Sequence, residues 1–169
     1  MRFFSRWNVA AALLAAALSV VPGRLIAQTP TLEFRLVDSP MTAEQALQTR
    51  PPANSEILYG MGDKRPYLVE RQVLVPGTAM CDAQPGRDQR TGEPIVLFRL
   101  DAEGRKRFAE TTQANVGRPF AIVFDNQVIS APVIREPITG GSGQISGPFT
   151  AVQANDIANR IKASAATKC

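Results

Sequence analysis

The sequence predicts an α+β fold: a small mixed or antiparallel sheet with two main helices packed on it. Short apolar stretches of strand length follow one another through turn-rich connections, which is typical of strands that pair as hairpins. Two longer segments carry apolar residues at helical spacing. Because these segments do not alternate regularly with the strands, an α/β fold with a parallel sheet is not favoured. Residues 28–169 are expected to form a single domain with one core.

Residues 1–27 have the composition of a cleavable signal peptide. Arg2 and Arg6 precede an apolar core at 9–21, which is too short to cross a hydrocarbon layer that takes about 20 residues. We therefore expect cleavage after Ala27, a periplasmic or secreted product, and no stable membrane insertion. Without the arginines of this leader, the last of which is Arg24, the 19 basic residues fall to 16, against 15 acidic ones. A nucleic-acid partner is not indicated.

The mature chain opens with a strand and a short helix. Side chains alternate between apolar and charged over 31–36, which predicts a half-buried strand. Thr42 and Gln45 then form a capping-box pattern at the start of a helix over 42–48. Two further strands are expected at 57–59 and 67–75.

The middle of the chain predicts a surface connection followed by a strand and the first main helix. Residues 80–94 are polar and rich in turn formers, so we expect a connection there. An apolar strand follows at 95–100. Asp101 is placed to cap a helix over 102–116, and Gly117 marks its end.

A β-hairpin is expected next. The apolar run 120–124 is too short for a helix, and 128–133 supplies the return strand. Between them, Asp125 and Asn126 suit a two-residue turn that requires positive φ. Because Pro132 cannot donate to a ladder, the return strand should end there or lie at a sheet edge, where a second chain could pair with it.

The last third ends with a glycine-rich loop, a short strand at 144–146 and the second main helix. Thr150 and Gln153 repeat the capping-box pattern at the start of that helix. The helix presents one apolar face, formed by Ala154, Ile157, Ala158 and Ile161. The glycine spacing matches neither the dinucleotide fingerprint nor a P-loop, so no nucleotide cofactor is expected.

Residues 118–147 resemble, almost residue by residue, the first periplasmic domain of SecD, the accessory subunit of the bacterial preprotein translocase. The family usually carries Asp-Gly in the hairpin turn, where this chain has Asp125 and Asn126. Weaker similarity extends over 32–37, the helix at 103–117 and the last helix at 149–158. The resemblance therefore covers nearly the whole mature chain.

The resemblance implies a periplasmic head that contacts unfolded or translocating polypeptide, together with components of the Sec translocase. SecD also has a segment before this region that completes a ferredoxin-like base, and membrane helices after it that carry the proton-coupled work. We expect this chain to lack both, and hence to perform no proton-driven transport by itself. A sheet edge left unpaired would make a homodimer plausible.

The candidate polypeptide-binding residues flank the glycine-rich loop, where apolar side chains alternate with free backbone groups. They are Ile134, Pro137, Ile138, Thr139, Gly140, Gly141, Gln144 and Ile145. The alternative interpretation is that the three isoleucines belong to the core, which is the more frequent place for this residue type.

The residue types argue against an enzyme. The chain has no histidine, which removes the usual base of serine and cysteine hydrolases and a common metal ligand. Two carboxylate pairs keep a hydrolase open as an alternative: Asp101 with Glu103, and Asp125 with Glu136. Because helix capping and turn formation account for two of these acids, we expect no catalysis, no metal and no cofactor. A structural or oligomerisation scaffold of the cell envelope is the other alternative.

Cys81 and Cys169 are the only two cysteines. In an oxidising compartment an even number favours a bridge. An internal disulfide and a pair of free or intermolecularly bonded thiols both remain open at this point.

Overall fold

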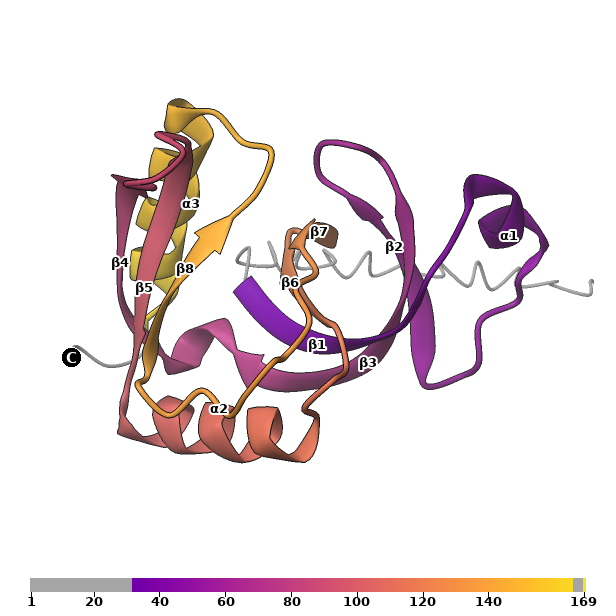
Figure 1. Ribbon diagram of the computed structural model, residues 1–169, viewed down its shortest axis with the longest axis horizontal. Coiled ribbons are helices and arrows are strands. Elements are labelled where there is room, and N and C mark those ends of the chain that lie inside the picture. The colour runs from indigo at the N-terminus through magenta and orange to yellow at the C-terminus, as the bar shows by residue number, and fades with distance from the viewer. Residues whose placement is uncertain (1–31, 166–168) are drawn as a thin grey trace, which may run out of the picture.

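The strands divide between two sheets in the computed structural model, which describes residues 32–165 and 169 (Figure 1). One sheet is a closed barrel with the order β1 (Leu32–Pro40), β3 (Pro66–Pro76), β2 (Ser55–Gly60), β7 (Gln127–Ser130) and β6 (Phe120–Phe124). The other has the order β4 (Met80–Arg87), β5 (Pro94–Leu100) and β8 (Ser142–Ser146). The helices are α1 (Ala43–Gln48), α2 (Ala102–Ala114) and α3 (Ala151–Ser164), and a 3-10 turn, η1 (Gly77–Ala79), joins β3 to β4. The α+β class is confirmed, and the parallel pairing of β2 with β7 makes the barrel a mixed sheet.

Each helix begins where the sequence predicts. The side chain of Thr42 accepts from the amide of Gln45, and that of Thr150 accepts from the amide of Gln153, so both capping boxes are present. Asp101 caps α2 by accepting from the amide of Gly104 at 2.7 Å. These caps satisfy amides that have no partner within the helix.

The β6–β7 hairpin is confirmed, with a shorter return strand than expected. Asp125 and Asn126 have φ values of 50° and 58°, as a type I′ turn requires. β7 ends at Ser130, two residues before Pro132, and pairs with β2 on its far side. The hairpin therefore closes the barrel, and the open edges lie in the second sheet.

The prediction of a surface connection throughout 80–94 is wrong, because its first half forms β4. Met80 and Ala83 are buried there. Asp88 donates its amide to the carbonyl of Glu93, so every second residue pair along β4 and β5 shares hydrogen bonds. Pro85 belongs to one of the intervening pairs, which share none. The missing N–H of Pro85 would point away from the sheet, which is where an edge strand tolerates proline.

Two apolar clusters hold the fold together, and β6 contributes to both. Its five residues are all buried: Ala121 and Val123 join the cluster inside the barrel, while Phe120, Ile122 and Phe124 face the second sheet and the helices. Because successive side chains of a strand point to opposite faces, a continuous apolar run is what two-sided burial requires.

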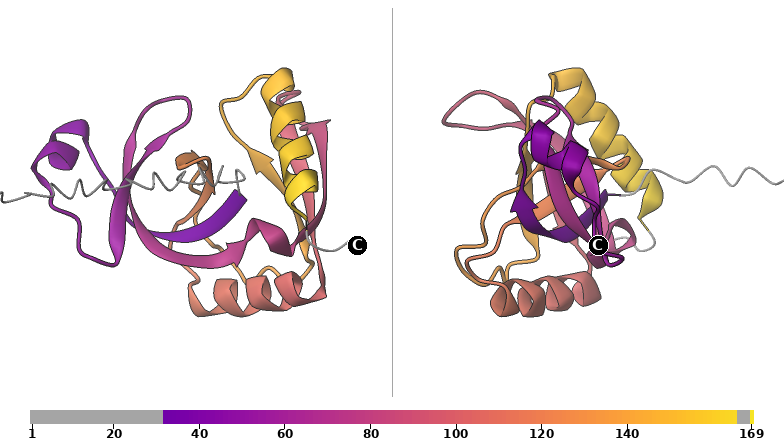
Figure 2. Two further views of the ribbon diagram at one scale, coloured as in Figure 1. Left: turned by 180° about the vertical axis from the view of Figure 1, so that it is seen from behind. Right: turned by 90° about the vertical axis from the view of Figure 1, so that its right-hand side faces the viewer.

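The contacts between barrel and second sheet centre on Phe34. Its ring centroid lies 5.6 Å from that of Phe98, 5.1 Å from that of Phe108 and 5.8 Å from that of Phe120. α2 runs beneath the barrel and the second sheet, and α3 covers the second sheet (Figure 2). The predicted inner face of α3 is confirmed, since Ala154, Ile157, Ala158 and Ile161 are all buried.

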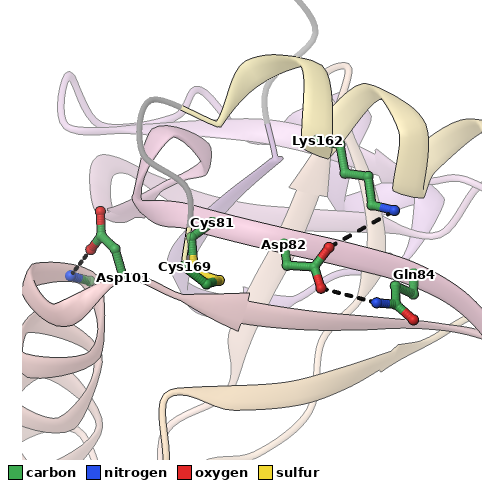
Figure 3. The surroundings of a disulfide bond; sticks show 7 residues. Cys81, Asp82, Gln84, Asp101, Lys162 and Cys169 are labelled. Carbon is green, nitrogen blue, oxygen red and sulfur yellow. Dashed lines mark hydrogen bonds and ion pairs between the residues drawn. A yellow bond between two sulfur atoms is a disulfide. The ribbon is translucent and has the colours of Figure 1, made fainter.

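The chain end is tied back to β4. Cys81 and Cys169 form a disulfide with their Cα atoms 4.9 Å apart, and nearby Lys162 lies 3.9 Å from the carboxylate of Asp82 (Figure 3). α3 also reaches the barrel, because Arg160 pairs with Asp125 and lies 4.5 Å from the ring centre of Phe124.

The predicted signal peptide lies outside the described residues. Among the residues that are described, no helix has the length and apolar character to span a membrane.

Candidate functional site

An apolar pocket of about 340 Å³ opens between the barrel and the second sheet. Its floor is the aromatic cluster around Phe34, with Ile122 beside it. One wall is the extended segment 132–136, and the other is the beginning of β8. The lining residues are Phe34, Phe98, Phe108, Phe120, Ile122, Pro132, Val133, Ile134, Arg135, Glu136, Ile138, Ser142, Gly143 and Gln144.

The wall formed by β8 is an open sheet edge. Leu100 donates its amide to the carbonyl of Gly141 at 2.8 Å, so this pair and every second pair along β5 and β8 share hydrogen bonds. Ser142, Gln144 and Ser146 fall at the intervening positions. Their backbone N–H and C=O groups therefore point away from β5, along the side of β8 where no further strand pairs.

β8 carries none of the features that usually block an edge. It reads Ser-Gly-Gln-Ile-Ser, without proline or charge. Pro85 interrupts the donors on the outer side of β4, at the opposite edge of the same sheet. Natural sheets use proline and charged residues to prevent pairing at an edge. β8 has neither, so its edge is the less protected of the two.

The glycines at the start of β8 are held in place by close packing. Gly141 has φ of 67° and is buried, and a Cβ atom there would lie 2.8 Å from side-chain carbons of Arg105. At Gly143 a Cβ atom would lie 2.9 Å from the ring of Phe98. The lack of a side chain at Gly143 therefore allows the ring of Phe98 to pack directly against the backbone of β8.

Thr112 fixes the segment that leads from the pocket wall to β8. Its side chain is buried in α2, and its hydroxyl donates to the carbonyl of Phe108 at 2.8 Å. The same oxygen accepts from the amide of Ile138 at 2.8 Å. Since an unpaired buried amide is costly, this hydroxyl holds the segment at Ile138 against α2, just before the chain reaches the glycines.

The structure separates the eight predicted binding residues. Ile134 and Ile145 are 2% and 0% exposed, so both are core residues, as the alternative interpretation held, and the expectation that they contact a client from the surface is corrected. Ile134 nevertheless borders the pocket from the core side. Half-buried Ile138 and exposed Gln144 also line the pocket. The other four, none of which lines the pocket, are exposed Pro137, Thr139 and Gly140 and buried Gly141.

The sequence did not reveal the pocket residues supplied by the core. Phe98 and Phe120 lie on strands correctly predicted from their apolar patterns, and Gly143 lies in the predicted glycine-rich loop. Nothing in a strand pattern distinguishes a phenylalanine that is packed on all sides from one that forms the floor of a pocket.

Arginines outnumber acids around the pocket. Arg135 and Glu136 line it, Arg105 packs against Gly141, and Arg99 lies opposite Ser142 in the β5–β8 register. In the part of the chain that the structure describes, no carboxylate lies within ion-pair distance of these three arginines. Their charge is available to a ligand.

Asp88 meets the pocket residue Gln144 at the end of the second sheet. The Gln144 side-chain amide donates to the Asp88 carboxylate at 3.1 Å. The backbone amides of Thr91 and Arg90 also donate to this carboxylate and, with Gln144, hold the pKa of Asp88 below its ordinary value. A charged Asp88 thus orients the Gln144 side chain across the outer face of β8.

Three of the four acids considered for catalysis have structural partners. Asp101 caps α2, Glu103 lies 3.7 Å from Arg107, and Asp125 pairs with Arg160. Glu136 lines the pocket. Over residues 32–165 and 169, no cluster of acidic or cysteine side chains is arranged to hold a metal ion.

Comparison with known protein families agrees with this architecture. Residues 55–167 match the family model of the SecDF P1 head subdomain. Protein translocase subunit SecD of Acetobacter pasteurianus is 44% identical over 144 residues, which cover 83% of this chain and 27% of that protein. The SecD subunit of Desulfurispirillum indicum is 42% identical over 142 residues, covering 79% of this chain and 28% of that protein. The chain thus spans about a quarter of the length of these relatives.

Solved structures of SecDF share the fold. One, described as a membrane component that enhances protein export, superposes with a TM-score of 0.61 at 35% identity, covering 80% of this chain and 63% of that one. SecDF in its super-membrane-facing form gives a TM-score of 0.61 at 34% identity, covering 82% of this chain and 19% of that one. On this combined evidence, the chain belongs to the SecDF P1 head subdomain family.

Proposed function

We propose that this protein is a non-enzymatic polypeptide-binding module of protein translocation, which holds extended segments of exported chains at the open edge of β8. The observation that carries the proposal is that this edge adjoins the apolar pocket. Membership in a family whose named relatives are protein translocase subunits supports the process.

Strand addition explains how such a site would accept many different clients. Backbone groups of Ser142, Gln144 and Ser146 would bond to the main chain of the incoming segment, and these bonds do not depend on its sequence. Apolar side chains of the segment would enter the pocket against Phe98 and Phe120. Affinity thus comes from features that every unfolded chain offers, and no reacting group is needed.

We further propose a periplasmic location, with components of the Sec translocase as partners. The predicted leader at 1–27 supports export. The Cys81–Cys169 disulfide supports an oxidising compartment, where such bonds form and persist.

A proline at position 144 tests the proposed edge directly. The amide of Gln144 points away from β5, so Gln144→Pro removes an outward donor and adds a ring at the edge while keeping the ladder to β5. Gln144→Ala removes the same side chain, including its contact with Asp88, but keeps the amide. The probe is a reduced, carboxymethylated protein that stays unfolded, and its binding to the full mature chain is measured by fluorescence anisotropy.

We expect wild type and Gln144→Ala to bind the probe and Gln144→Pro to lose binding while its far-UV spectrum and melting temperature are retained. Equal binding by the two variants would contradict a role for the edge. Light scattering on the same samples tests the scaffold alternative: a tight dimer dissociated by Gln144→Pro, with no probe bound by wild type, would favour pairing of two β8 edges.

A further inference from the structure

We infer that the site selects extended segments in which two large apolar side chains flank one residue, with an acidic residue between or beside them. This inference rests on the proposed function and specifies its ligand. It follows from three properties of the site: the volume of the pocket, the absence of a side chain at Gly143, and the charges around the opening.

The volume accommodates more than one side chain. An apolar cavity of about 150 Å³ binds benzene. The pocket, at about 340 Å³, is roughly twice as large, which corresponds to two groups of that size. Side chains at positions i and i+2 of a strand point to the same face and lie about 6.5 Å apart. Two such side chains, from one extended segment, would fill the pocket.

The register of β8 determines which side chains of the segment turn inward. Gly143 and Phe98 form a pair on the face of the sheet that looks into the pocket, whereas Gln144 and Leu97 form a pair on the outer face. A strand added to β8 continues this alternation. Residues beside Gly143 would therefore enter the pocket, and the residue beside Gln144 would remain in solvent.

Gly143 acts as the specificity-determining residue in this arrangement. A Cβ atom at this position would lie 2.9 Å from the ring of Phe98, so any other residue would displace the ring, which forms part of the pocket floor. Nearby Gly140 offers a matched control, because a Cβ atom there would meet nothing within 4 Å and its φ is not in the left-handed region.

The charges around the opening favour an acidic ligand. Arg99, Arg105 and Arg135 surround the start of β8 and, over the described residues, have no carboxylate within ion-pair distance, whereas Glu136 is the only acid that lines the pocket there. Arg99 projects on the outer face opposite Ser142, so it lies nearest the middle residue of a segment whose two apolar side chains lie beside Gly141 and Gly143, away from the Asp88 carboxylate that Gln144 contacts. An aspartate at that position would complement it.

Three labelled eight-residue peptides test this inference against the full mature chain. The first alternates, with Phe-Asp-Leu among serines and threonines, and the second has the same composition with Phe and Leu adjacent. The third replaces the Asp of the first with Lys. Dissociation constants are measured by fluorescence anisotropy at low and moderate salt.

We expect the alternating peptide to bind about tenfold more tightly than the adjacent one, because only alternation buries both apolar side chains. The Lys peptide should bind several-fold more weakly than the Asp peptide at low salt, with a smaller difference at moderate salt since exposed charges are screened. Gly143→Ala should weaken binding of the alternating peptide about tenfold, and Gly140→Ala should leave it unchanged.

The outcomes separate this inference from the proposed function. Equal affinities for alternating and adjacent peptides would overturn the inference while polypeptide binding stands. Absence of binding by every peptide and by the unfolded protein probe would overturn both. If Gly143→Ala lowers the melting temperature enough to prevent folding, the comparison between peptides on wild type still decides the result.

Discussion

Replacing Thr112 with valine tests whether one buried hydroxyl positions the wall of the pocket. The side chain is 1% exposed, and its oxygen accepts from the amide of Ile138 while donating to the carbonyl of Phe108, each at 2.8 Å. Valine has the same shape but leaves the amide of Ile138 unpaired. Such a loss costs about 1–3 kcal/mol of unfolding free energy, or roughly 4–12 °C in melting temperature for a domain of this size.

Serine is the matched control, since it keeps the hydroxyl and removes only a methyl group worth about 1 kcal/mol. Urea denaturation gives the free energies, and hydrogen exchange reports on the amide of Ile138. We expect that amide to exchange faster in Thr112→Val and to stay protected in Thr112→Ser. Unchanged protection of Ile138 in the valine variant, together with wild-type stability, would refute the reasoning.

Three further changes test contacts that join distant parts of the chain. Arg160→Ala should lower the unfolding free energy by about 1–2 kcal/mol through loss of the partly exposed pair with Asp125 and the contact with the Phe124 ring; Arg160→Lys should lose less because it keeps the positive charge, and a loss as large as that of alanine would show that the charge alone contributes nothing. Replacing both Cys81 and Cys169 with serine should destabilise the chain by up to about 4–5 kcal/mol in the loop-entropy model, measured by denaturant unfolding against wild type with and without reductant; equal midpoints in all samples would contradict a stabilising bridge. Asn126→Val should cost about 1–2 kcal/mol because it forces a β-branched residue to a φ of 58°, whereas Asn126→Gly should fold normally, and thermal melts that rank the two variants in the opposite order would exclude a type I′ turn.

Local chemistry explains which elements could be predicted. The caps at Thr42, Asp101 and Thr150 depend on residues within three positions of one another, so the sequence contains the whole interaction. The turn at Asp125 and Asn126 is equally local. The inner face of α3 also follows from spacing along a single helix.

β4 could not be predicted in the same way, because its pairing partner decides it. Proline and glycine at 85–86 indicate a turn by themselves. They are tolerated in a strand only because β5 pairs along one side and leaves Pro85 at an outward position of the edge. A local pattern contains no information about which edge a strand will occupy.

The candidate site was likewise predicted in part from local sequence, and in part depends on tertiary packing. The segment that the sequence selected does lead to the pocket, and Ile138 and Gln144 line it. Ile134 and Ile145 were predicted on the same grounds but are buried in the core, since each alternates inward from its extended segment, and Ile134 borders the pocket only from the core side. The orientation of a single apolar side chain depends on what covers it, which is a property of the packed chain.

The sequence by itself determined the α+β class, the starts of the helices, the hairpin and the similarity to SecD, because each of these depends on residues that lie near one another along the chain or on motifs shared between relatives. Only the tertiary structure decided that the strands divide between a closed barrel and a second sheet, that β8 is left as an open edge, and that four phenylalanines from separate elements meet beneath it. The physical reason is that sheet order and pocket volume arise from contacts between residues far apart in sequence, whose free energies are set by shape and burial together.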